Sequence, residues 1–149
     1  MQINKVTRKV RLETRLDSIK YQLITELVFL RKMQLIDSDL TYLSYLTVMG
    51  PMPLKDFCHQ MVLVLHGPDV TMDPNKYPVR LQTVRNRLNT LEKKGLVLKQ
   101  GKGKKQIMLN PAIGIEISGS VLLDYNFIYI ETKEGKGLDS QIGERVAAL

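Results

Sequence analysis

An α+β fold is predicted for this 149-residue chain, made of three to four helices, a β-hairpin, an additional long C-terminal β-strand and extended termini. Apolar residues recur at helical spacing between residues 17 and 94, which indicates helices that each bury one face. Two short apolar runs then flank a Gly/Lys-rich turn at 101–105, which is typical of a hairpin. A run rich in β-branched and aromatic residues at 121–130 indicates the further strand.

We expect one domain at 17–131, preceded by a basic arm at 1–16 and followed by a polar tail at 132–149. The chain is 44% hydrophobic, which supplies one core, and it is too short for two full-sized domains. The arm has aliphatic residues scattered among its cations, so it fits either a strand or a tail. The glycine-punctuated C-terminal segment is too polar to bury a core, and we expect it to be mobile.

Three amphipathic helices are predicted before residue 67. The first begins at about residue 17, the second at 37 or 38, and the third spans 54 to about 65. Asp and Ser side chains can cap the first two, and Gly-Pro dipeptides follow the second and third. The positions expected to be buried are Ile19, Leu23, Leu27, Leu30 and Met33, then Leu40, Leu43, Leu46 and Val48, then Leu54, Phe57, Met61 and Leu65.

Residues 66–79, HGPDVTMDPNKYPV, are predicted to form an irregular, proline-rich loop. A helix-turn-helix motif joins its helices by a turn of only a few residues, so this loop leaves the angle between them unfixed. It is as suited to contacting another chain as to being a passive insertion.

The segment from Arg80 to Pro111 predicts a helix followed directly by the hairpin. The helix would bury the face that carries Leu81, Val84, Leu88 and Leu91, and Gly95 would end it in a positive-φ conformation. The strands of the hairpin would lie at 96–98 and 107–109, around the turn at 101–105.

The same segment concentrates the positive charge of the chain. Residues 80–105 contain nine basic residues and one acid, Glu92, whereas the net charge of the whole chain is +7. A basic helix beside a basic hairpin tip is the charge pattern expected for contact with a phosphate backbone. The alternative is an ordinary solvated surface, on which such local concentration is uncommon.

The strand at 121–130 is longer than a helix-plus-hairpin unit needs. Asp124 and Asn126 indicate that one of its faces is partly exposed to solvent. Gly119 marks a bend at the start of the strand. Its edge would pair with another strand, in the same molecule or in a neighbour.

No catalytic site, metal site or cofactor is predicted. Cys58 is the only cysteine and lies in the apolar pattern of the third helix, which is typical of a buried structural residue. His59 and His66 lack the partners of a catalytic triad or a zinc site, and the glycines at 101–105 lack the spacing of a phosphate-binding loop. No apolar run could span a membrane, and we expect a soluble, cytoplasmic protein.

The span from about Leu40 to Pro111, above all TVRNRLNTLEKKGLVLKQGKGKKQIMLNP, resembles winged helix-turn-helix proteins such as the MarR-like regulators and plasmid replication initiators. The resemblance implies a winged-helix core, although the loop at 66–79 is longer than the turn of that family. It also implies a set of contacts to DNA or an acidic partner. The helix would supply Gln82, Thr83, Arg85, Asn86 and Arg87, and the wing would supply Lys102, Lys104 and Lys105.

A second resemblance covers more of the chain. A helical first half, a winged core and then LNPAI with the strand VLLDYNFIYIET are similar to small proteins of crAss-like bacteriophages, some of which are structural. Such phages build a collar below the portal from rings of small proteins. This resemblance implies a ring or head–tail connector protein of the virion.

We therefore expect a non-enzymatic structural or assembly protein of a phage virion, in a portal-proximal ring or the tail neck. Its partners would be further copies of itself, other virion proteins of the portal or neighbouring rings, and double-stranded DNA, without a membrane. It would assemble in the host cytoplasm. The alternative is a DNA-binding transcriptional regulator or replication protein of the bacterial cytoplasm, built on the same winged helix.

Overall fold

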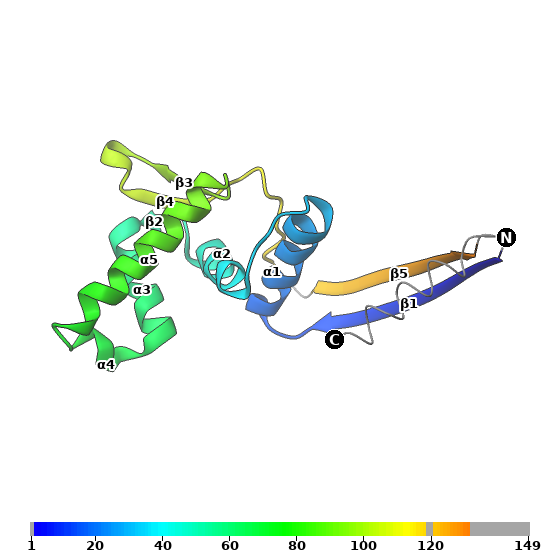
Figure 1. Ribbon diagram of the computed structural model, residues 1–149, viewed down its shortest axis with the longest axis horizontal. Helices are drawn as coiled ribbons and strands as arrows, with labels where there is room; N and C mark the ends of the chain where they lie inside the picture. The colour runs from blue at the N-terminus through cyan, green and yellow to red at the C-terminus, as the bar shows by residue number, and fades with distance from the viewer. Residues whose placement is uncertain (1, 119–120, 132–149) are drawn as a thin grey trace. The chain divides into compact units, whose positions relative to one another are not determined.

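The computed structural model describes residues 2–118 and 121–131, which form two compact units (Figure 1). One unit is a ribbon made of the segments 2–12 and 121–131. The other, from Glu13 to residue 118, contains helices and a small sheet. The predicted α+β class is confirmed. The predicted tail at 132–149 lies outside the described residues.

The ribbon pairs the two ends of the described chain. Strand β1 (Gln2–Leu12) runs antiparallel to strand β5 (Val121–Glu131), with Val6 opposite Phe127. Thr7 also donates a side-chain hydrogen bond to Asn126 across the strands, at 2.7 Å. From the sequence the arm fits either a strand or a tail, and residues 121–131 are expected to belong to one domain with the helices. In the structure the two segments hydrogen-bond to each other along one edge of each strand.

The first helix differs from its prediction at its start, where Asp17 and Ser18 lie inside the helix and do not cap it, and in its second half. Helix α1 (Arg15–Leu23) begins after Thr14, whose hydroxyl accepts a hydrogen bond from the backbone N–H of Asp17. It continues as a π-helix, η1 (Ile24–Leu30). The wider turn rotates the side chains that follow Leu27 off the buried stripe. Leu30, predicted to be buried, is therefore 66% exposed.

The next two helices have the predicted bounds to within about a residue. Helix α2 (Asp37–Met49) is followed by strand β2 (Met52–Pro53) and helix α3 (Leu54–His66). Of the predicted inward positions, Leu65 is wrong, because it is 41% exposed at the end of α3. The others are buried or packed against the core.

The loop predicted at 66–79 is largely helical. Helix α4 (Pro68–Thr71) follows α3, and helix α5 runs from Lys76 to Lys93, four residues earlier at its start than predicted. Only residues 72–75 link the two. The carboxylate of Asp73 accepts hydrogen bonds from the backbone N–H groups of Asn75 and Lys76, at 2.8 and 3.1 Å. Pro78 fits because N–H groups in a first helical turn have no partner within the helix.

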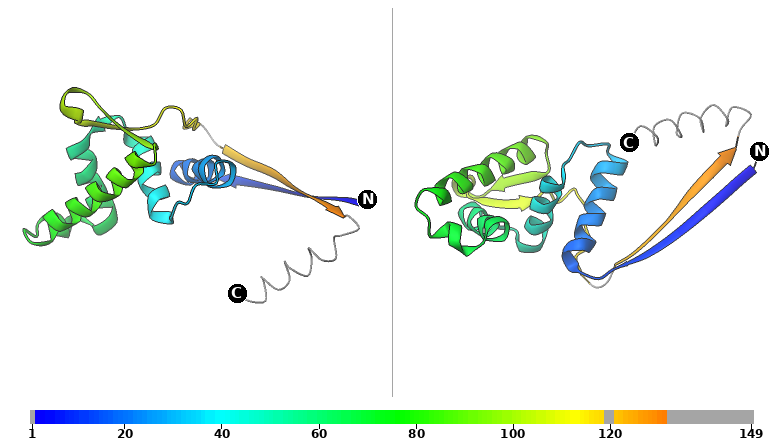
Figure 2. Two further views of the ribbon diagram at one scale, coloured as in Figure 1. Left: turned by 45° about the horizontal axis from the view of Figure 1, so that its top comes forward. Right: turned by 60° about the horizontal axis from the view of Figure 1, so that its bottom comes forward.

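The sheet of this unit has three antiparallel strands in the order β2-β4-β3. Strands β3 (Val97–Gln100) and β4 (Gln106–Leu109) form the predicted hairpin, and a short 3-10 helix, η2 (Lys102–Lys104), makes its turn. Gly95 adopts the expected positive φ, 78°, at the end of α5. In both views of Figure 2 the yellow-green hairpin runs beside the green helix α5.

The core of the unit joins α5 to the other helices and the sheet. Val84, Leu88 and Leu91 are buried as predicted, whereas Leu81 is only partly buried. They share one cluster with residues of the earlier helices, namely Leu43, Leu46, Phe57 and Met61. This packing determines which side of α5 remains exposed to solvent.

Candidate nucleic-acid interface

A groove of about 640 Å³ lies between the start of α3, helix α5 and the hairpin. Its walls come from three stretches that are far apart in the sequence. They are Pro53 to Asp56, then Gln82, Arg85, Leu88 and Asn89, and then Lys99 with Gly103 to Lys105. The groove therefore belongs to the packed helical unit and needs no part of the ribbon.

Main-chain bonds hold the start of α3 against the hairpin. The backbone N–H of Leu54 donates to the carbonyl oxygen of Lys105 at 2.7 Å. Strand β2 also pairs with β4, which places Pro53 opposite Gln106. These bonds bring Lys55 to the groove although it lies 50 residues before Lys105 in the sequence.

The groove is strongly positive. Five cations line it, Lys55, Arg85, Lys99, Lys104 and Lys105, against one carboxylate, Asp56. All of these cations except Lys99 are exposed. A concave surface lined by charges of one sign concentrates ions of the opposite sign, so the groove favours an anionic partner.

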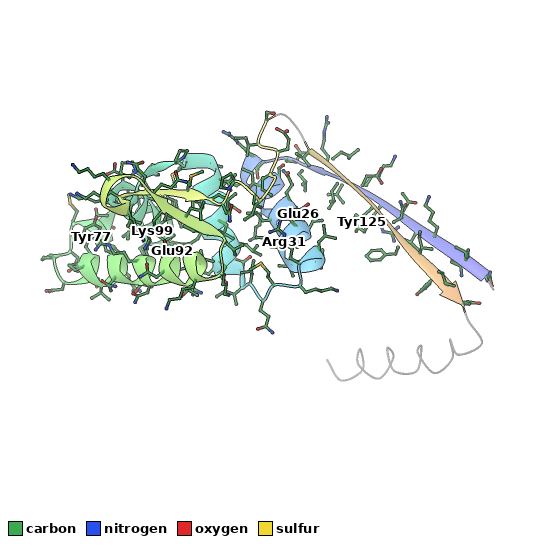
Figure 3. The ribbon with its side chains drawn as sticks, turned by 90° about the horizontal axis from the view of Figure 1, so that it is seen from above. Glu26, Arg31, Tyr77, Glu92, Lys99 and Tyr125 are labelled. Atoms are coloured by element: carbon green, nitrogen blue, oxygen red, sulfur yellow. The ribbon has the colours of Figure 1, made fainter. Side chains whose placement is uncertain are left out.

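Lys99 is held in place by its neighbours on α5. Its ammonium group donates to the side-chain oxygen of Asn89 at 2.6 Å and lies 3.7 Å from the Glu92 carboxylate (Figure 3). This pairing offsets part of its charge. The exposed cations therefore dominate the attraction for an anion.

Arg85 lies where α5 meets α3. Its positive charge acts on the thiol of Cys58, a fully buried residue of α3. Burial raises the pKa of that thiol, and Arg85 offsets only part of the rise. Cys58 is therefore protonated at neutral pH, unlike a thiolate nucleophile.

Half of the eight predicted contacts line this groove, namely Gln82, Arg85, Lys104 and Lys105. Lys102 is exposed in the hairpin turn outside the lining. On the outer face of α5, Gln82 donates its amide to the side-chain oxygen of Asn86 at 2.8 Å. Thr83 donates its hydroxyl to the carbonyl of Val79 at 3.1 Å.

Arg87 is directed to a different part of the unit. Two residues along a helix rotate the side chain by about 200°, so Arg87 cannot share the side of Arg85. It pairs instead with Asp39 of α2, at 3.0 Å. Its guanidinium is thus committed to a structural contact.

Three residues of the groove, Lys55, Asn89 and Lys99, are not among the contacts predicted from the sequence. Lys99 belongs to the basic segment 80–105, so charge density alone is enough to suggest it. Lys55 carries no local signal, because its place depends on the pairing of β2 with β4.

The two histidines lie outside this lining. The Nδ1 atom of His59 is 2.5 Å from the hydroxyl oxygen of Tyr77, which ties α3 to the first turn of α5. Within residues 2–118 and 121–131, no group of three or more His, Cys, Asp or Glu residues is placed to hold a metal ion. No helix in that part of the chain is long and apolar enough to cross a membrane.

No protein-family model, curated protein or solved structure matches this chain.

Proposed function

We propose that this chain is a non-enzymatic DNA-binding protein whose helical unit is a winged helix. The observation that carries the proposal is the groove between α3, α5 and the hairpin, with five cations and one carboxylate. The hairpin β3–β4 would be the wing. A fold supports many functions, so the argument rests on the groove rather than on its likeness to a winged helix.

The groove suits phosphates better than base edges. Its exposed cations lie on three separate elements, which allows several contacts along one sugar–phosphate backbone. The amides that could read bases, Gln82 and Asn86, are hydrogen-bonded to each other. We therefore propose binding that depends strongly on salt and weakly on sequence.

The test measures binding of a short DNA duplex by fluorescence anisotropy over a range of salt concentrations. The groove variant is Lys104→Glu with Lys105→Glu. Its control is Lys76→Glu with Arg80→Glu, which reverses two exposed cations of α5 outside the groove lining. Both variants change the net charge equally.

The groove variant should weaken binding by about a hundredfold at low salt. It should also reduce the slope of log affinity against log salt concentration by about two, one for each lost phosphate contact. The control variant should keep most of the affinity and most of the slope. If the two variants lose affinity equally, binding follows net charge alone and the groove has no special role.

A second candidate is a structural or assembly protein of a crAss-like phage virion, in a portal-proximal ring or tail neck. The ribbon favours it, because Phe127 and Tyr129 are 66% and 59% exposed and suit a protein partner. The groove would then face packaged DNA or acidic neighbours. Assembly would take place in the host cytoplasm, with further copies of the chain or other virion proteins.

The sequence preference of DNA binding distinguishes a regulator or replication protein from a virion protein. A regulator or replication protein should prefer one site over random DNA by about a thousandfold or more. A virion protein should bind all sequences alike. A thousandfold preference would exclude the virion protein as the explanation of the groove, and it would also overturn the weak sequence dependence proposed above.

A further inference from the structure

The β1–β5 ribbon has two chemically different faces. Cross-strand partners project to the same side of an antiparallel pair, and successive residues alternate between sides. The register Val6 opposite Phe127 therefore defines one face, which we call the aromatic face. It carries Val6, Val10, Leu123, Tyr125, Phe127 and Tyr129.

The rings on this face already contact each other. Tyr125, labelled in Figure 3, and Phe127 pack edge to face with their centroids 5.3 Å apart. Phe127 and Tyr129 nevertheless remain mostly exposed, at 66% and 59%. A two-stranded ribbon is marginally stable in water without a covered apolar face. The aromatic face thus leaves two large rings without a cover.

Charge separates the faces further. The opposite face holds three cations, Lys5, Lys9 and Arg11, against Asp124, and these interrupt its aliphatic residues. The aromatic face has one cation, Arg8, and one anion, Glu131, so its net charge is close to zero. Two copies of the aromatic face can therefore meet without like-charge repulsion, whereas two copies of the opposite face cannot.

The area of the aromatic face suits a dimer. Each strand has 11 residues, which gives a face about 36 Å long at about 3.3 Å per residue. Fully buried aromatic side chains contribute about 150–250 Å² each, so Phe127, Tyr129 and Tyr125, which are 66%, 59% and 36% exposed, offer about 240–400 Å² of ring surface per copy. Two such faces, with the half-exposed Val6 and Val10, stay below about 1,200 Å² in total, which is the size range of weak and reversible association.

From these observations we propose that the aromatic face is a dimerisation surface, which packs against the same face of a second copy of this chain. The two ribbons form a four-stranded, two-layered sandwich related by a two-fold axis. The phenyl ring of Phe127 lies mid-strand and is the anchor of the interface. The proposal uses no residue of the basic groove, so its test is independent of DNA binding.

The test is sedimentation of the full chain over a wide range of concentrations. Phe127→Thr removes the anchor and keeps a residue that favours strands. Ile128→Thr is the matched control, because the neighbouring Ile128 is 61% exposed and projects from the opposite face. The native chain should show a reversible monomer–dimer equilibrium. Phe127→Thr should weaken it by about thirtyfold or more, the effect of losing a central aromatic anchor, and Ile128→Thr should leave it within about threefold.

A second measurement on the unmutated chain keeps the proposal testable if Phe127→Thr disrupts the ribbon itself. Amide hydrogen exchange in β1 and β5 should slow as the protein concentration rises, because dimerisation covers the ribbon. Three results would each overturn the proposal. They are a monomer at every concentration, equal weakening by the two variants, and ribbon exchange that is independent of concentration.

A chain that ends at Glu131 tests whether another segment provides the association. It should dimerise like the full chain. If dimerisation is lost with residues 132–149, those residues and not the aromatic face hold the copies together, which would also overturn the proposal.

Discussion

Arg87 donates a hydrogen bond from Nη1 to Oδ1 of Asp39 at 3.0 Å, and the Asp39 side chain is only 3% exposed. The other carboxylate oxygen, Oδ2, accepts from the backbone N–H of Ile36 at 3.1 Å, just before α2 begins. A buried carboxylate is costly unless it is paired and hydrogen-bonded. Arg87 thus makes the start of α2 compatible with burial, and in doing so it joins α2 to α5.

Replacing Arg87 should destabilise the helical unit. Arg87→Ala leaves the Asp39 carboxylate without its cation, and we expect a loss of about 1–3 kcal/mol in the free energy of unfolding, because one side of the pair remains partly solvated. Urea unfolding would measure it. Arg80→Ala, an exposed arginine of the same helix, should change stability by less than about 0.5 kcal/mol.

A comparison of Arg87→Ala with Arg85→Ala distinguishes a structural role from a contact with DNA. Arg85→Ala should weaken DNA binding more than Arg87→Ala does, whereas Arg87→Ala should be the more destabilising change. The reverse order for both properties would return Arg87 to the interface and remove Arg85 from it.

Local patterns were sufficient for most of the helical unit. Helical spacing on one face of α5 predicts that Leu88 is buried, and the rarity of positive φ in other residues predicts that Gly95 ends the helix. Each of these two predictions depends on a few adjacent residues. The hairpin followed from the same kind of evidence, since its strands and turn are contiguous.

The features that were missed depend on contacts between distant segments or on uncommon backbone geometry. Leu30 is exposed because η1 winds as a π-helix, which the usual helical spacing does not anticipate. Lys55 joins the groove through strand pairing, and the partner of Arg87, Asp39, lies 48 residues away in the sequence. The pairing of β1 with β5 likewise joins opposite ends of the chain.

Leu88 should be a major contributor to the core. This residue of α5 is 1% exposed and belongs to the core cluster that includes residues of α3 and the sheet. Leu88→Ala removes buried methyl groups and leaves a cavity, so we expect a loss of about 2–5 kcal/mol in the free energy of unfolding, measured in urea. Asn89→Ala, at the next and exposed position, should cost much less. Equal effects would show that Leu88 is not part of the core.

Cys58 should report the opening of the helical unit. Burial raises the pKa of its thiol, and the residue is fully buried between α3 and its neighbours. The native protein should therefore react with an aromatic disulfide reagent far more slowly than the urea-unfolded protein at the same pH. Leu88→Ala should accelerate the reaction by increasing the open fraction. Immediate reaction of the native protein would contradict the burial of this thiol.

Asp73 should make the stability of the helical unit depend on pH in the acid range. The backbone N–H groups of Asn75 and Lys76 donate to its carboxylate and lower its pKa in the folded state. The unfolded chain then binds the proton more readily, so the stabilisation is fully present above the ordinary pKa of an aspartate. It is lost as the pH falls through the lower, folded value.

The measurement compares the melting temperatures of the native chain and Asp73→Asn between about pH 7 and about pH 3. An asparagine amide can still accept these hydrogen bonds but carries no charge, so the native chain should be the more stable at neutral pH, and the difference should narrow on acidification. Asp69→Asn, which removes an exposed carboxylate nearby, controls for the change in net charge. A difference between the native chain and Asp73→Asn that is constant with pH would show that the Asp73 carboxylate does not hold the start of α5 through its charge.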